Sequence, residues 1–125
     1  MDFRLGRAIK EYLEKNGLMN NCDIVSLGGA AKNVAAPASE ANFITVMKQI
    51  ERAQKLHAIN TVILMNHTDC GAYGGRAVFT SREEERAKHR EDMTKAAEVI
   101  KQLYPELGIQ TVLADIQDSG EINFV

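Results

Sequence analysis

The chain has 125 residues, the size of one ordinary domain, and a formal net charge of −2. A surface that binds nucleic acid is normally basic, so this charge argues against that class of partner. Hydrophobic and charged contents of 45% and 26% are those of a globular protein, and no apolar run approaches the roughly 20 residues that a membrane span needs. We therefore expect one domain over residues 1–125.

Helix and strand patterns alternate along the first half of the chain. Apolar side chains recur at helical spacing in two segments, and a short apolar run between them has the length of a strand. Gly17 is typical of the residue after a helix, and Ser39 of the residue before one. The predicted elements are a helix over residues 7–15, a strand over 23–27 and a helix over about 39–57.

The second half continues the same alternation. Ser81 and Glu84 form a capping box, which predicts the start of a long polar helix that ends before Pro105. The charged run over residues 81–92 is predicted to be a solvated helix face, with His89 at the surface or in an interface. The predicted strands cover residues 61–66, 111–114 and 121–125.

The alternation of strands and helices predicts an α/β domain with a mainly parallel sheet flanked by helices. Cys22 falls at the start of a predicted strand and Cys70 after the end of another, so the two should lie at opposite ends of the sheet. We expect Cys22 to be a small buried residue. Met1 leads directly into a charged segment, unlike a signal peptide, so we expect a cytoplasmic protein with reduced thiols.

The most informative stretch is His67-Thr68-Asp69-Cys70-Gly71, directly after the predicted strand 61–66. In open α/β sheets the chemistry gathers at the carboxyl ends of the strands. Imidazole and thiolate are two of the ligands that a tetrahedral zinc site uses, and Gly71 allows a close backbone approach to a ligand. From this spacing alone, a polar loop histidine and a buried cysteine are the better interpretation.

The amino terminus supplies a second pattern, Asp2-Phe3-Arg4. Together with His67 and Cys70, it resembles the β-class carbonic anhydrases, which carry Cys-x-Asp-x-Arg at one strand end and His-x-x-Cys at another. Asp2 and Arg4 match the aspartate and arginine of the first motif. The stretch from His67 to Gly74 also resembles a short carbonic-anhydrase-like branch, and so does the glycine pair Gly28-Gly29.

The resemblance implies roles for residues around a zinc pocket. Gly28 and Gly29 would bring the backbone close to the pocket, although an ordinary turn is nearly as good an interpretation. Tyr73 would line the pocket mouth with Gly71, or would simply cover the core. Asp69 would orient a neighbouring group as an outer-shell partner, although a loop aspartate needs no role.

The same resemblance implies a zinc ion held by His67, Cys70 and, conditionally, Asp2. In the family this aspartate either binds zinc or turns to the arginine and leaves a position for water, so Asp2 and Arg4 are the candidate catalytic pair. Without the resemblance, the two residues are a solvated salt bridge worth about 1 kcal/mol or less.

The first cysteine of the family motif, and the strand that carries it, would fall ahead of Met1. That strand is central in the family, and a sheet without it has bare edges. We therefore expect that the chain is a fragment, starts late or borrows a strand from a partner. A thin sheet and an amphipathic first helix also predict a homodimer that buries residues 7–15.

The resemblance implies a zinc-dependent carbonic anhydrase that converts carbon dioxide to bicarbonate. Zinc lowers the pKa of a bound water to about 7, which gives hydroxide at neutral pH. Two alternatives stay open. One is a non-catalytic relative that has lost a ligand and serves as a binding or assembly module. The other is a related zinc hydrolase of another small heterocumulene.

Overall fold

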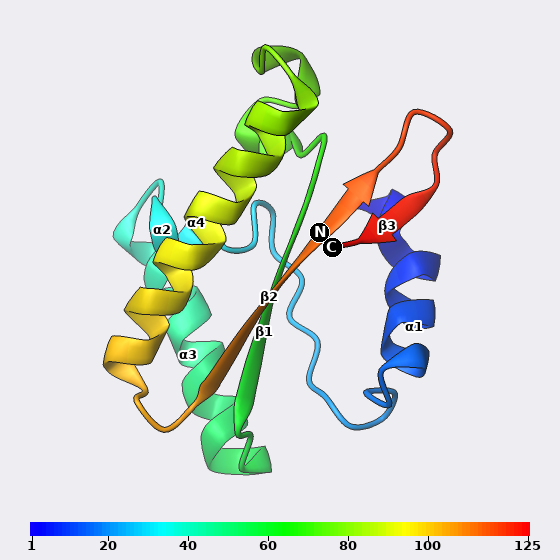
Figure 1. The fold of residues 1–125 in the computed structure, drawn as a ribbon. Helices are drawn as coiled ribbons and strands as arrows, with labels where there is room; N and C mark the ends of the chain where they lie inside the picture. Colours follow the sequence, from blue (N-terminus) through cyan, green and yellow to red (C-terminus); the bar gives the residue numbers. More distant parts are fainter.

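The computed structural model describes all residues 1–125 and contains a three-stranded sheet in the order β1–β2–β3 (Figure 1). The strands are β1 (Thr61–His67), β2 (Gly108–Ile116) and β3 (Ile122–Phe124). β1 and β2 are parallel, whereas β2 and β3 are antiparallel. The α/β class is confirmed, but the sheet is mixed, so a mainly parallel sheet is not confirmed.

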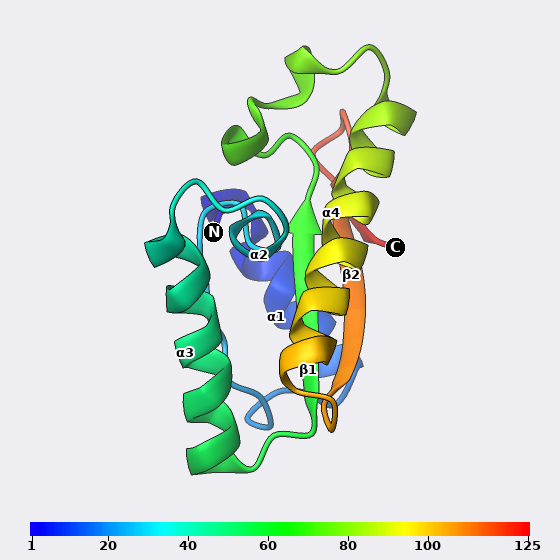
Figure 2. The same ribbon diagram turned by 90° about the vertical axis from the view of Figure 1, so that its left-hand side faces the viewer.

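Four helices cover the two faces of this sheet, and the predicted ones are confirmed. Serine side chains cap the two long helices: Ser39 accepts a hydrogen bond from the backbone of Asn42, and Ser81 from that of Glu84. Figures 1 and 2 show α2, α3 and α4 on one side of the sheet and α1 on the other. The helices are α1 (Gly6–Lys15), α2 (Lys32–Ala35), α3 (Glu40–His57) and α4 (Arg82–Leu103).

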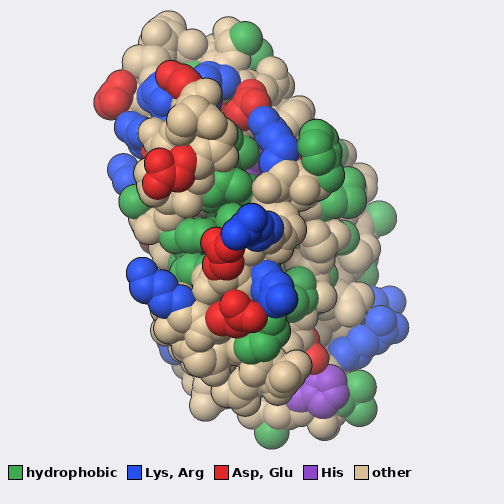
Figure 3. Space-filling model, turned by 90° about the vertical axis from the view of Figure 1, so that its right-hand side faces the viewer, with side chains coloured by type: hydrophobic (Ala, Val, Ile, Leu, Met, Phe, Trp, Pro, Cys, Tyr) green, Lys and Arg blue, Asp and Glu red, His purple; other side chains and the backbone are tan.

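The side of the molecule that carries α1 and β3 has interspersed charges (Figure 3). Two ion pairs between successive turns, Arg7–Glu11 and Lys10–Glu14, lie on the outer face of α1. None of the helices is long and apolar enough to cross a membrane.

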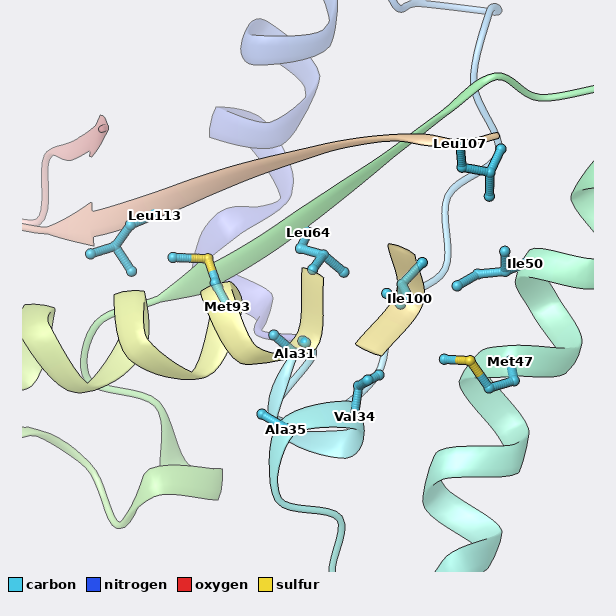
Figure 4. Packing of buried hydrophobic residues seen from close by; sticks show 11 residues of the cluster. Ala31, Val34, Ala35, Met47, Ile50, Leu64, Met93, Ile100, Leu107 and Leu113 are labelled. Carbon is cyan, nitrogen blue, oxygen red and sulfur yellow. The ribbon is translucent and has the colours of Figure 1, made fainter. Parts of the chain in front are cut away.

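The main hydrophobic core fills the space between the sheet and α2, α3 and α4 (Figure 4). Leu64 of β1, Leu113 of β2 and Ile100 of α4 belong to this cluster, and neither Leu113 nor Ile100 exposes any surface. Leu5 packs in a smaller cluster on the opposite face, where α1 lies against β2 and β3. The sheet is thus covered on both faces at the carboxyl end of β2. The site described below lies at the same end of the sheet, where β1 ends.

The predicted strand over residues 23–27 is wrong. The segment forms no strand, and none of its backbone N–H groups donates a hydrogen bond to another backbone group. Ile24 and Val25 expose 65% and 52% of their surface. Apolar, β-branched residues favour an extended conformation, but a strand also needs a neighbour to complete its ladder, and β1 pairs with β2 alone.

Cys22 is exposed, so its predicted burial is wrong. It lies in a bend before the irregular segment 23–27 instead of at the start of a paired strand, and the core does not extend to it. The two cysteines are both free.

Candidate functional site

The candidate site lies where β1 ends. His67 is the last residue of β1 and pairs in register with Ala114 of β2. Thr68 continues the ladder, since its N–H donates to the Ala114 carbonyl over 3.1 Å and its hydroxyl accepts from the Ile116 N–H over 2.8 Å. The chain then turns into the short helical turn η2 (Gly71–Tyr73), and Cys70 stands just before this turn.

Hydrogen bonding fixes which ring nitrogen of His67 is free. Nδ1 lies 2.9 Å from the Thr68 carbonyl oxygen and must carry the proton, because a carbonyl only accepts. The opposite nitrogen, Nε2, is buried without a hydrogen-bond partner. Metal-binding histidines are held in this way, with one nitrogen on a backbone carbonyl and the other directed at the ion.

Cys70 is buried beside His67, with 5% of its surface exposed. Burial alone raises the pKa of the thiol, but His67 and the backbone N–H groups of Ala72 and Tyr73 lower it below the ordinary value. In turn, burial lowers the pKa of His67, yet the neighbouring Cys70 and the Asp2 carboxylate leave it raised. Cys70 therefore loses its proton more readily than an ordinary cysteine, and the thiolate is the form that binds a metal.

Asp2 and Arg4 form a two-pronged ion pair next to His67. Asp2 Oδ1 accepts from Arg4 Nε over 3.0 Å, and Oδ2 accepts from Nη2 over 2.8 Å. Arg4 thereby holds the pKa of Asp2 well below its usual range. Asp2 Oδ2 is 4.0 Å from His67 Nε2. The carboxylate is thus turned toward the arginine and remains adjacent to the imidazole.

Asp69 joins the loop after β1 to the amino-terminal segment. Its carboxylate accepts from Arg4 Nη1 over 2.7 Å, and its carbonyl accepts from Arg4 Nη2 over 3.1 Å. It has a left-handed backbone with φ of +55°. The candidate outer-shell residue therefore contacts the candidate catalytic arginine directly.

The predicted pocket residues lie in different surroundings. Gly29 has φ of +78°, and a Cβ there would stand 3.1 Å from the Cβ of Ala72, so the backbone approaches the loop of Cys70 closely. Gly28 belongs to the same turn, and its carbonyl accepts from the Asn33 side chain over 2.8 Å. A Cβ at Gly71 would meet no neighbour within 4 Å.

Tyr73 covers a buried polar cluster that the sequence interpretation missed. Its hydroxyl accepts from Asn66 Nδ2 over 3.1 Å, and its ring centroid lies 4.2 Å from that of His89. Burial raises the pKa of Tyr73, and burial lowers the pKa of His89 to about 4.

The expectations of a surface His89 and of a solvated run over residues 81–92 are therefore wrong in part. His89, Glu85 and Asp92 are buried, with no more than 3% of their surface exposed. They face inward because they share the side of α4 that carries Met93 and Ile100. Their helical spacing to these apolar residues was the signal that could have identified them.

The donor set fits a zinc ion in part. His67 Nε2 and Cys70 provide the nitrogen and sulfur that zinc prefers. No group of three or more His, Cys, Asp or Glu side chains is arranged to hold a metal ion, since Asp2 is bonded to Arg4. His67 and Cys70 are suited to a metal, and Asp2 would join them only by turning from the arginine.

An α/β fold with a His–Cys pair at a strand end, beside an Asp–Arg pair, defines a carbonic-anhydrase-like protein. The chain belongs to the family described as "Putative carbonic anhydrase", whose model matches residues 1–125.

Two similar proteins are uncharacterized and bring no activity. An uncharacterized protein of Rickettsia conorii is 33% identical over 116 residues, covering 90% of this chain and 62% of its own length. An uncharacterized protein of Rickettsia bellii is 32% identical over 116 residues, covering 90% of this chain and 71% of its own length. The chain thus spans 62% and 71% of these two relatives. No solved structure matches it.

Proposed function

We propose that the chain carries the site of a zinc-dependent carbonic anhydrase, which interconverts carbon dioxide and bicarbonate. The observation that carries the proposal is the unpartnered Nε2 of His67, buried beside the Cys70 thiol, in a ring whose Nδ1 is bonded to the Thr68 carbonyl. The description of the family supports the same activity.

Each residue has a role in this proposal. His67 and Cys70 hold the zinc ion, which when bound supplies a Lewis acid that activates water. Arg4 keeps the Asp2 carboxylate turned away, through hydrogen bonds of 3.0 and 2.8 Å, and so leaves a ligand position open. Gly29 brings the backbone close to the loop of Cys70, since a Cβ there would stand 3.1 Å from that of Ala72.

A non-catalytic binding or assembly module is the second candidate. The observation in its favour is that the three candidate donors are not arranged as a metal site. A zinc hydrolase of another small heterocumulene shares every residue of the first proposal, and only a substrate assay separates the two.

A homodimer and a cytoplasmic location belong to the same proposal. The apolar side of α1 already packs within the chain: Ile9 contacts the cluster of Leu5, and the Tyr12 ring lies 4.7 Å from that of Phe124. A dimer that buries α1 would therefore use its outer face, and light scattering at high concentration tests for it.

The deciding experiment combines elemental analysis with stopped-flow hydration of carbon dioxide. It is run on residues 1–125 and on the full product of the gene. We expect stoichiometric zinc and hydration in the form with a complete donor set, and weaker zinc binding where a donor is missing. Cys70→Ser should abolish zinc binding, while Cys22→Ser, at the exposed cysteine, should leave it unchanged.

The outcomes separate the candidates. Stoichiometric zinc without hydration between about pH 6 and 9, a range that spans the expected pKa of the water, would favour another heterocumulene as substrate. Absence of zinc from both forms would favour the non-catalytic module.

A further inference from the structure

We propose that Asp69 and Glu85 are positioning residues, which seat the Asp2–Arg4 pair against His67. The inference rests on the proposed function for its catalytic meaning. Its structural content is independent of that function, because it concerns how one segment of the chain is fixed to another.

The first step is the contact between Asp69 and Arg4. Asp2 and Arg4 are two residues apart and can pair wherever their segment lies, so their mutual bonds do not place them at the site. Arg4 also donates to the carboxylate and the carbonyl of Asp69, over 2.7 and 3.1 Å, across 65 positions of sequence. This fork fixes the guanidinium plane, and with it the Asp2 carboxylate, beside His67.

The second step is the support of Asp69 itself. Its backbone is left-handed, a conformation that residues other than glycine adopt uncommonly, and surrounding contacts hold it there. The N–H of Asp69 donates to Glu85 Oε1, and Asp69 Oδ1 accepts from the Arg76 N–H over 3.0 Å. The backbone and the side chain of Asp69 are therefore both fixed.

The third step is the burial of Glu85. Its residue exposes no surface, and its second carboxylate oxygen accepts from Arg76 Nε over 3.2 Å. A buried carboxylate needs such partners to offset its lost hydration. One of these partners is the backbone N–H of Asp69. The buried Glu85 carboxylate therefore holds the loop between His67 and Cys70 in place.

These contacts form one continuous path, from Glu85 to Asp69, then to Arg4 and Asp2. An amide at position 69 can accept from Arg4 or from Arg76, but its NH₂ group would then face the other donor. Asp69→Asn should therefore release Arg4 or the loop without a large change of volume.

The matched control is Asp118→Asn. Asp118 also pairs with Arg76, over 3.0 Å, but does not contact Arg4, and its side chain is 82% exposed. Glu85→Gln serves as a second variant, because it leaves one acceptor for the Asp69 N–H and opposes its NH₂ group to Arg76 Nε.

The first measurement is hydrogen exchange followed by NMR on the metal-free chain, which needs no activity. The Arg4 guanidinium donates from Nη1 to the Asp69 carboxylate over 2.7 Å, so the exchange of its Nη protons reports whether the segment is seated on the loop. We expect it to speed up in Asp69→Asn and Glu85→Gln but not in Asp118→Asn. The Leu113 N–H, bonded to the Val125 carbonyl, should keep its protection in all three, which separates local release from global unfolding.

The second measurement is turnover in a double-mutant cycle on the zinc-loaded full chain. Asp69→Asn should lower kcat by about 10- to 100-fold, as for other outer-shell partners, with zinc content unchanged. In an Arg4→Ala background the same substitution should have no further effect, because the residue acts through Arg4.

Unchanged exchange at Arg4 in Asp69→Asn, or additive effects in the cycle, would overturn the positioning role even if the chain hydrates carbon dioxide. Faster exchange at Arg4 in Asp69→Asn, combined with no hydration of carbon dioxide by the unmutated chain, would support the seating and refute the proposed function.

Discussion

His67 Nε2 and Asp2 Oδ2 lie 4.0 Å apart, although 65 residues separate them in the sequence. The end of β1 provides the imidazole, and the segment before α1 provides the carboxylate. Both oxygens of Asp2 are bonded to Arg4, so the carboxylate can bind elsewhere only by giving up the arginine. Whether Asp2 pairs with Arg4 or turns toward His67 therefore determines what the carboxylate does at this site.

Arg4→Ala should lower turnover more than zinc content. Without the guanidinium, Asp2 is free to occupy the position that water needs, and we expect kcat to fall by about tenfold or more. Elemental analysis and stopped-flow hydration measure the two quantities on the same sample. Arg7→Ala is the control, because Arg7 is exposed and pairs only with Glu11. Equal loss of zinc and turnover would assign Arg4 to metal retention instead.

Gly29→Ala should destabilise the chain more than Gly17→Ala. Both glycines have positive φ, +78° and +67°, so both substitutions carry the cost of a left-handed alanine, about 1–2 kcal/mol. Only the Cβ at position 29 also meets a neighbour, Ala72 Cβ at 3.1 Å, which adds about 1 kcal/mol or more. Urea unfolding of the two variants measures the difference, and equal losses would show that the approach of Gly29 to Ala72 relaxes freely.

The sequence predicts α1, α3 and α4 and the strands β1, β2 and β3 well, because each has its own periodicity or end signals. It does not predict the short helix α2. Residues 23–27 were mistaken for a strand because pairing depends on a neighbour that local sequence does not reveal. His67 and Cys70 could be identified as a candidate site only when their spacing after a strand was combined with the Asp2–Arg4 pattern and the resemblance to the β-class carbonic anhydrases. The partners of Asp69, namely Glu85 and Arg76, could not, because their contacts depend on how α4 packs over the loop.

Ile100→Ala should cost about 2–5 kcal/mol of unfolding free energy, the range for truncating a large buried side chain. Ile100 exposes no surface and lies in the cluster that joins α4 to the sheet. Leu103→Ala, three residues along the same helix, should cost much less, since Leu103 is 54% exposed. Denaturant midpoints give both values, and similar losses would argue that the end of α4 packs differently.

Stability should fall as the pH drops from about 6.5 toward 4, because of His89. Burial lowers the pKa of this imidazole to about 4 from the ordinary 6.5. Between these values the unfolded chain binds a proton that the folded chain does not bind. The free energy of unfolding therefore decreases as the pH falls. The difference of about 2.5 units corresponds to a loss of stability of about 3 kcal/mol. This loss is complete near pH 4 and is zero above about pH 7.

His89→Gln should flatten this part of the pH profile, because glutamine does not titrate. His57→Gln, at the exposed end of α3, should keep it. Urea unfolding at about pH 7.5, above both pKa values, and at about pH 6 and 5, between them, measures the slopes of the variants and the parent chain. Carboxylates with lowered pKa, such as Asp2 and Asp115, lose their stabilising charge only at lower pH and leave this window to histidine. A slope that persists in His89→Gln would mean that another group takes up the proton, or that water reaches the ring and the imidazole is not held neutral by burial.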